Sequence, residues 1–310
     1  MKILVTGGAG FIASHIVDYY IKLGHKVIII DNLSAGKKEY INPKAIFFHE
    51  DIRNIEAIKS IFAKEKPEVL NHHAAQINLR KSVADPIDDA KINILGLLNL
   101  LEAGIRHDLK KVIFASSGGA IYGEAKVLPT PENYEPKFPL TPYGITKMTS
   151  EQYIHFYFNK YQLPFVILRY SNVYGPRQDP FGEGGVVAIF SQKLLKKENP
   201  IINGDGEQMR DFIYVDDVVQ ANVQALYKNV NAAVNIATST DTSINELFSH
   251  LSHITGTSTL VKHAPSIPGE QKRSVLDNTF ASKILAWKSS TQLVVGLKKT
   301  VLSFKKYYTK

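Results

Sequence analysis

The chain contains no cysteine. This absence excludes a disulfide framework and a metal site built on thiolates. It is also typical of a reducing compartment, so we expect a cytoplasmic location. No stretch approaches the roughly 18 uncharged apolar residues that a membrane helix needs. The first apolar run, Ile3 to Val5, reaches the glycines at 7 and 8 too soon to form a signal peptide. We therefore expect no association with a membrane.

The chain also lacks long runs of one charge sign. It carries 37 basic and 29 acidic residues, a formal net charge of +8. The lysines are scattered, apart from five in residues 298–310, which we interpret as a solvated helix end. We therefore predict no nucleic-acid partner. With 310 residues, 44% of them hydrophobic and 21% charged, the chain is typical of an enzyme with one large or two intimate domains.

Short apolar runs alternate with helical patterns in the first half of the chain. This alternation predicts a parallel sheet covered on both faces, a doubly wound α/β (Rossmann) fold. Glycine- and proline-rich loops at 174–185 and 263–271 then interrupt the rhythm. We expect residues 1–171 plus about 216–237 to form the sheet domain, and about 172–215 and 238–310 to form a smaller α/β substrate lobe. The expected strands are 2–6, 27–30, 45–48, 68–70, 111–115, 166–169 and 233–236, and the expected helices include those ending at 23 and those near 54–64, 88–106 and 217–227.

The first predicted strand leads into a glycine-rich turn. Gly7, Gly10 and Ala13 lie three residues apart in ILVTGGAGFIA, a spacing typical of dinucleotide-binding turns. Glycine permits the sharp turn and the approach of a pyrophosphate to the following helix, whose dipole favours anions. Asp31 ends the second strand, where a carboxylate accepts hydrogen bonds from ribose hydroxyls and repels a 2′-phosphate. The pattern predicts NAD rather than NADP; an ordinary strand–helix turn is the alternative.

Tyr143 and Lys147 are four residues apart at the start of a predicted helix, and therefore share one face. An ammonium group next to a phenol lowers the pKa of the phenol, so the pair predicts a tyrosine base, helped by the charge of the nicotinamide. A surface contact within the helix is the alternative. A serine–glycine segment, residues 115–119, ends a strand about 25 residues earlier and favours the catalytic interpretation.

Eight motifs occur in a characteristic order along nearly the whole chain. In this order and with these motifs the sequence resembles the extended short-chain dehydrogenase/reductases, within them the NAD-dependent epimerase/dehydratase group, and most closely its UDP-hexose 4-epimerases. The resemblance implies an isomerase that interconverts UDP-glucose and UDP-galactose through a 4-keto sugar, with tightly bound NAD regenerated in each turnover. It also implies a homodimer formed through a helix bundle. The motifs are TGGAGFIAS, DNLS, EDIRN, HHAAQ, SSGGAIYG, YGITK, LRYSNVYGPRQ and GDGEQMRDFIYVDDV.

The same resemblance implies a set of site residues. Tyr143, Lys147 and Ser117 are the implied catalytic residues. The implied NAD contacts are Gly7, Gly10, Phe11 and Ile12 at the pyrophosphate; Asp31, Asn32, Ser34 and Gly36 at the ribose; Asp51 and Ile52 at adenine; and Ala74, Ala75, Gln76, Asn93, Tyr143, Lys147, Tyr170 and Val173 at the nicotinamide side. The implied substrate contacts are Ser117, Tyr143, Asn172, Val187, Ile202, Arg210 and Glu270.

The sequence departs from the family pattern at three places. Gly118 replaces the usual Ser or Thr, so we take Ser117 as the substitute hydroxyl, with backbone hydrogen bonding at the strand end as the alternative. Ile267 replaces an arginine near the nucleotide; either Lys272 or Arg273 replaces the missing charge, or the affinity for UDP is lower. Ser274 is small where the family sets pocket volume, so UDP-N-acetylhexosamines are predicted to fit. The SSGGAIYG segment contains no acid, which favours epimerisation over dehydration or decarboxylation.

Other interpretations stay open at this point. A net NAD-dependent reductase would use the same Tyr143 and Lys147, and a non-catalytic nucleotide-binding protein would fit the pI of about 9.3. His72 and His73 point to opposite sides of a strand, so we predict no metal site. The apolar helices at 88–106 and 148–161 are predicted to form the dimer bundle, with simple core packing as the alternative.

Overall fold

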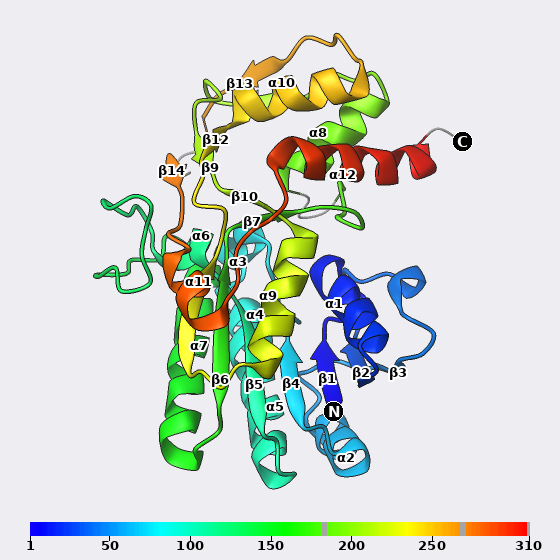
Figure 1. The fold of residues 1–310 in the computed structure, drawn as a ribbon, viewed down its shortest axis with the longest axis vertical. Coiled ribbons are helices and arrows are strands. Elements are labelled where there is room, and N and C mark those ends of the chain that lie inside the picture. The colour runs from blue at the N-terminus through cyan, green and yellow to red at the C-terminus, as the bar shows by residue number, and fades with distance from the viewer. Residues whose placement is uncertain (182–184, 267–270, 309–310) are drawn as a thin grey trace.

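The computed structural model describes residues 1–181, 185–266 and 271–308. Its centre is a seven-stranded sheet in the order β11-β6-β5-β4-β1-β2-β3, with every neighbouring pair parallel (Figure 1). The doubly wound parallel sheet is therefore confirmed. The strands are β1 (Lys2–Thr6), β2 (Lys26–Asp31), β3 (Ile46–His49), β4 (Val69–His72), β5 (Lys111–Ser117), β6 (Phe165–Tyr170) and β11 (Ala232–Ile236).

Helices cover both faces of this sheet because successive strand residues point to opposite sides. On one face Ile3, Val5 and Ile29 pack in a core with α1 (Phe11–Lys22), α9 (Val215–Tyr227) and α11 (Thr279–Leu285). On the other face Leu4 and Ile28 pack with α2 (Ile55–Glu65), α5 (Gly96–Arg106) and α7 (Pro142–Tyr161). The continuous apolar strands seen in the sequence are thus buried on both sides.

The helix expected at 88–106 is built in three parts. Asp85 caps α4 (Pro86–Ala90), and a π-helical turn, η2 (Lys91–Leu95), joins α4 to α5. The short helix α3 (Leu79–Ala84) precedes α4 and is capped by Asn78. A π-helical turn often accompanies a functional site, and this one holds Asn93 in a buried position.

A smaller group of elements lies above the carboxyl ends of the large sheet (Figure 1). Its helices α8 (Val186–Leu195), α10 (Ile244–Thr255) and α12 (Leu293–Tyr308) share one apolar core. Its strands form three small sheets: β7 (Asn172–Tyr174) with β10 (Phe212–Tyr214); β8 (Ile201–Asn203) with β13 (Lys262–Ala264); and β9 (Met209–Arg210) between β12 (Thr242–Ser243) and β14 (Arg273–Ser274). None of the described helices is long and apolar enough to cross a membrane.

One segment lies outside the domain in which we expected it. Ala281 and Leu285 of α11, together with Trp287, pack into the core between the large sheet and α9. The indole nitrogen of Trp287 donates to the backbone oxygen of Asp217 at 2.9 Å. Residues 279–287 therefore pack with the sheet domain, whereas the sequence predicts that they belong to the lobe.

Candidate active site

The glycine-rich turn joins β1 to α1 at the carboxyl edge of the sheet. Gly7 has φ of +69°, and a Cβ there would lie 2.9 Å from the backbone nitrogen of Ala74. Gly10 caps α1 without a side-chain hydrogen bond, and its own N–H donates to the Gly7 oxygen at 2.9 Å. Phe11 and Ile12 form the first turn of the helix. The turn therefore needs glycine at Gly7 and leaves the helix end without a side-chain cap, as an incoming anion requires.

Asp31 is buried at the end of β2 beside this turn. Its carboxylate accepts hydrogen bonds from the backbone N–H of Ala9 at 2.9 Å and of Leu33 at 2.8 Å. Burial raises the pKa of Asp31, and the two backbone donors act in the opposite direction. A Cβ at Gly36 would lie 2.9 Å from the same carboxylate. The loop 34–37 thus folds back over Asp31, and the expected ribose contacts lie together, with Ser34 N–H donating to the Asn32 side chain at 3.0 Å.

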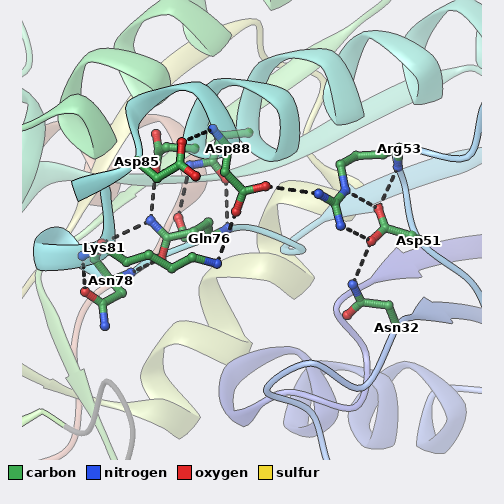
Figure 2. Close-up of polar contacts among 10 residues, drawn as sticks. Asn32, Asp51, Arg53, Gln76, Asn78, Lys81, Asp85 and Asp88 are labelled. Carbon is green, nitrogen blue, oxygen red and sulfur yellow. Dashed lines mark hydrogen bonds and ion pairs between the residues drawn. The ribbon is translucent and has the colours of Figure 1, made fainter. Parts of the chain in front are cut away.

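Figure 2 shows a line of polar contacts on the expected adenine side, running from Asn32 through Asp51 and Arg53 to Asp88. Arg53 donates to both carboxylate oxygens of Asp51, at 3.0 and 2.7 Å, and Asn32 donates to one of them at 2.9 Å. These bonds lower the pKa of Asp51 to about 2. The Asp51 acceptors are therefore already engaged within the protein.

The sequence predicts that Ile52 contacts adenine, but its side chain does not face this site. The side chain lies in the core between the sheet and α5, where a Cβ at Gly96 would come within 2.5 Å of it. Its backbone oxygen accepts a hydrogen bond from Asn99 at 3.0 Å. The apolar character that suggested a ligand contact is explained by core packing.

The segment after β4 lies next to the glycine-rich turn. Thr6 Oγ1 accepts hydrogen bonds from the N–H of His73 at 3.2 Å and of Ala74 at 3.1 Å. Asn93 brackets Gln76: its side-chain oxygen accepts from the Gln76 N–H at 2.9 Å, and its amide donates to the Gln76 oxygen at 3.0 Å. The structure therefore brings residues 74–76 and Asn93 together at the sheet edge.

This arrangement fits a dinucleotide. The glycine cradle leaves space that a Cβ would fill, the first turn of α1 has no side-chain cap, and a buried carboxylate follows the second strand. Small and polar groups continue along the edge from residue 74 to Gln76. The residues that would hold the cofactor thus line one continuous edge of the sheet.

Tyr143, Lys147 and Ser117 meet where β5 ends beside α7. Ser117 ends β5 beside Tyr143, close enough for its hydroxyl to act as a hydrogen-bonding group on the phenol and so to lower its pKa. The Lys147 ammonium donates to the Ala115 backbone oxygen at 2.8 Å and lies 5.8 Å from the centre of the Tyr143 ring. Thr141 caps α7 by accepting from the Gly144 N–H at 3.2 Å. The sequence spacing therefore brings a phenol, an ammonium and a hydroxyl to one place.

The ionisation of this pair in the protein alone differs from our expectation. Burial raises the pKa of Tyr143, whereas the hydrogen bond from Ser117 acts to lower it. Burial also lowers the pKa of Lys147 to about 8. We had expected the lysine charge to lower the tyrosine pKa, but loss of water is the larger effect because both groups lie under the sheet edge.

Leu276 explains the glycine at 118. A Cβ on Gly118 would come well inside van der Waals contact of Leu276 Cδ1 and within 3.2 Å of its other methyl group. Leu276 packs in a small core with Ile121 and Tyr122. A side chain at this position, which the family usually has, would require Leu276 to shift, whereas the adjacent Ser117 hydroxyl lies beside Tyr143.

Sequence reasoning missed a buried ion pair behind Ser117. Arg169 donates to both oxygens of Glu151, at 3.0 and 2.6 Å, and Ser116 donates to one of them at 2.5 Å. Both charged side chains are almost fully buried. Glu151 lies one helical turn after Lys147, and this i, i+4 spacing was the available signal. The pair fixes the end of β5 that carries Ser117.

Tyr170 and Val173 lie on the opposite side of the sheet edge. The Tyr170 hydroxyl is 3.0 Å from His73 Nε2 and accepts from the Asn222 amide at 2.8 Å. Val173, in β7, packs against both the sheet core and the lobe core. Burial lowers the pKa of His73 to about 3, so its imidazole is neutral near pH 7.

Two of the expected substrate residues lie near one another where the lobe meets the sheet. Asn172 donates through its backbone and its side chain to the Asp211 oxygen, at 2.9 and 3.1 Å. Arg210 donates to the Met209 oxygen at 2.9 Å. The Asp211 carboxylate accepts from Thr238 and Ser171, so it does not form the structural ion pair with Arg210 that was the alternative.

Two other expected substrate contacts are placed differently, and a third is not among the described residues. Val187 and Ile202 are 1% and 2% exposed in the core of the lobe, so their side chains do not reach a ligand surface in this structure. Their apolar character reflects packing of α8 and β8. Glu270, like Ile267, lies outside the described residues. Ser274 is next to the site, with its Oγ 3.9 Å from where a Cβ on Gly119 would be. In the described part of the chain no cluster of His, Asp and Glu could hold a metal ion.

Comparison with known proteins gives the family. Residues 3–237 match the NAD dependent epimerase/dehydratase family. The chain is 50% identical to a putative UDP-glucose 4-epimerase of Methanocaldococcus jannaschii, over 96% of this chain and 97% of the relative. The crystal structure of a Thermotoga maritima UDP-glucose 4-epimerase with UDP-glucose has a TM-score of 0.97 at 49% identity, covering 99% of both chains. A UDP-N-acetylglucosamine 4-epimerase of Methanobrevibacter ruminantium, in complex with UDP-N-acetylmuramic acid, has a TM-score of 0.93 at 36% identity, covering 99% and 98%. The chain belongs to the NAD dependent epimerase/dehydratase family, and its cofactor is NAD.

Proposed function

We propose that this protein is an isomerase that inverts C4 of a UDP-hexose, interconverting UDP-glucose and UDP-galactose through a 4-keto sugar. The observation that carries the proposal is the contact of Ser117 with Tyr143 beside Lys147, at the sheet edge that the glycine-rich turn shares. The relatives named as UDP-glucose 4-epimerases, at up to 50% identity over nearly the whole chain, support it.

In this function Tyr143 takes the proton of the sugar 4-hydroxyl and later returns it. Ser117 shares that proton through its hydrogen bond with the phenol, and the charge of Lys147 stabilises the phenolate. NAD, when bound, would supply the hydride acceptor, and its reduced form the hydride donor, for C4 of the sugar. Because burial disfavours a free phenolate, the proton must leave Tyr143 only when these partners are in place.

We also propose the implied ligand contacts, apart from the side chains of Ile52, Val187 and Ile202, which lie in the cores. Gly7, Gly10, Asp31 and the segment 74–76 with Asn93 hold the cofactor, and Asn172 with Arg210 meets the UDP diphosphate, to which a guanidinium is suited. The sheet domain would bind NAD and the lobe, without residues 279–287, would bind the UDP-sugar. Ser274 leaves room for an N-acetyl group, and the structural relative named as a UDP-N-acetylglucosamine 4-epimerase supports that substrate.

A homodimer through the helical segments 88–106, which includes η2 and α5, and 148–161, in α7, belongs to the same proposal. Phe156 and Leu95 are each 53% exposed. A surface hollow of about 370 Å³ on α7 is lined by Thr149, Gln152, Tyr153 and Phe156. Exposed apolar side chains grouped on neighbouring helices are typical of an interface. Light scattering should give twice the mass of the chain. We propose a cytoplasmic location and no nucleic-acid partner.

Proton NMR of the anomeric region tests the reaction. The protein is incubated with UDP-glucose and, separately, with UDP-N-acetylglucosamine, without added NAD. We expect the anomeric signals of the C4 epimers and no net absorbance at 340 nm, and Tyr143→Phe as a matched control should give neither epimer. A stoichiometric rise at 340 nm on addition of excess NAD would favour a net oxidoreductase, and no turnover of any sugar nucleotide would refute an epimerase.

A further inference from the structure

Asp89 is a buried carboxylate that neither the mechanism nor the ligand contacts use. It lies in α4, one helical turn before Asn93, and is 1% exposed. One carboxylate oxygen accepts from the Gln76 amide at 2.8 Å and from the Asn93 amide at 3.2 Å. The other accepts from the Thr146 hydroxyl at 2.8 Å. Figure 2 shows Gln76 directly under the α3–α4 segment.

All three donors to Asp89 are neutral. Its sequence neighbour Asp88 lies at the surface and pairs with Arg53 at 3.1 Å and with Lys81 at 3.1 Å. Among the described residues, no lysine, arginine or histidine lies within ion-pair distance of Asp89. A buried charge without a counter-ion is costly, so the compensating charge must act from further away.

The compensating positive charge is the Lys147 ammonium, on whose pKa the charge of Asp89 acts. Burial has the largest effect on the pKa of both side chains, and the negative charge of Asp89 acts to raise both pKa values. Glu151 also faces Lys147 from α7, but Arg169 holds it in a two-pronged ion pair. From β4 and the residue after it, the buried imidazoles His72 and His73 have lowered pKa values and are neutral near pH 7. From β5 the Ser117 hydroxyl acts on the phenol. Asp89 is thus the one negative charge near the pair without a cation bound to it, among the residues described.

We propose that Asp89 is a positioning residue whose fixed negative charge sets the ionisation of Lys147 and Tyr143 while its oxygens hold Gln76 and Asn93 on the nicotinamide side. Thr146 connects it to the catalytic helix, since the same hydroxyl lies 3.0 Å from the Tyr143 backbone oxygen. The effect of Asp89 on the pH profile of catalysis rests on the proposed function. Its effect on the ionisation of Lys147 and Tyr143 does not.

The consequence for pH follows from the sign of the charge. Burial already lowers the pKa of Lys147 to about 8, so the ammonium is close to losing its proton at physiological pH. Removing a nearby negative charge destabilises the ammonium and stabilises the phenolate. Both Lys147 and Tyr143 then titrate at lower pH, and the whole bell-shaped profile of kcat/KM moves in that direction.

Asp89→Asn removes the charge and keeps the hydrogen bonds. The asparagine oxygen can accept from Gln76 and Asn93 as the carboxylate does. Its amide can donate to the Thr146 hydroxyl, which in turn donates to the Tyr143 backbone oxygen. Asp88→Asn is the matched control, because it removes one negative charge from the adjacent residue at the surface. If Asp89→Asn does not fold, Asp89→Ser replaces it, since serine is also uncharged.

The decisive measurement is an NMR pH titration of Lys147 in the holoenzyme labelled with [ε-¹³C]lysine, with the resonance assigned by its loss in Lys147→Met. We expect Asp89→Asn to lower the Lys147 titration midpoint and Asp88→Asn to leave it in place. Both limbs of kcat/KM for the UDP-sugar should move with it. An unchanged midpoint in Asp89→Asn, or an equal shift in Asp88→Asn, overturns the proposal. A wild-type protein that epimerises no sugar nucleotide would refute the proposed function only, because the titration still decides the role of Asp89.

Discussion

The contact of Gly118 with Leu276 predicts whether Gly118→Ala raises or lowers the free energy of unfolding. A methyl group added by Gly118→Ala would overlap a Leu276 methyl group. Leu276 is buried against Ile121 and Tyr122 and has little room to move. Overpacking of this kind costs about 1–3 kcal/mol. Alanine recovers at most about 1 kcal/mol over glycine in a helix, here the short helix α6 (Gly118–Ile121). We expect a net loss of about 1 kcal/mol.

Leu276→Ala should reverse that sign. Alone, it costs about 2–5 kcal/mol because it leaves a cavity in a packed core. In this background the methyl group of Gly118→Ala meets no leucine and fills part of the cavity, so the substitution should stabilise by about 0.5–1 kcal/mol. The two substitutions are therefore coupled by about 2 kcal/mol, within the range that residues in contact show.

Thermal unfolding of the four proteins at one saturating NAD concentration measures this cycle, since ligand binding itself raises Tm. A loss of 1 kcal/mol corresponds to about 2 °C for a chain of this size. Gly119→Ala is the control, because the nearest atom to its added Cβ is Ser274 Oγ at 3.9 Å; it should show no coupling to Leu276→Ala. If Gly118→Ala raises Tm in both backgrounds, Leu276 does not exclude a side chain at this position and the explanation of the missing hydroxyl fails.

Two further predictions concern the catalytic group. Ser117→Ala should lower kcat about 10²–10⁴-fold with little change in KM, because it removes the hydroxyl that shares the proton with Tyr143; a rate of epimer formation by NMR near that of the wild type would rule Ser117 out. Lys147 has a pKa of about 8 when folded against 10.5 when unfolded, so between these pH values the unfolded state binds more protons and the free energy of unfolding rises with pH, by up to about 3 kcal/mol. Denaturant unfolding from pH 8 to 10.5 should show this rise in the wild type and not in Lys147→Met, and the same slope in both would refute the assignment.

The sequence predicted the parts of this molecule that depend on local pattern. Continuous apolar runs bounded by helices predict a parallel sheet, and β1, β2 and β5 lie where those runs are. The glycine at residue 7 is required by its positive φ, so the turn could be recognised from residue types alone. The i, i+4 spacing of Tyr143 and Lys147 likewise survives in α7 because helix geometry fixes it.

The parts that could not be predicted depend on contacts between distant segments. Asp89 and Thr146 are separated by 57 residues, and nothing in the DDA sequence distinguishes the buried Asp89 from the half-buried Asp88. Leu276 reaches Gly118 from the segment just after β14. From the sequence alone Gly118 is a missing hydroxyl, whereas in the structure a side chain there would contact Leu276. Ile52, Val187 and Ile202 were assigned to the ligand, but apolar side chains carry no signal that separates a site wall from a core.

The two acids near Lys147 show how the same residue type serves different ends. Glu151 is neutralised by Arg169, and it uses its remaining capacity to hold Ser116 at the end of β5. The charge of Glu151 is therefore largely compensated by Arg169. The main effect of Glu151 is to fix the end of β5, the strand that carries Ser117. Asp89 accepts only neutral donors, so its field extends to the catalytic helix. If Asp89 were also paired with a cation, the buried Lys147 would have no uncompensated negative charge near it. The pKa of Lys147 would then fall further below 8.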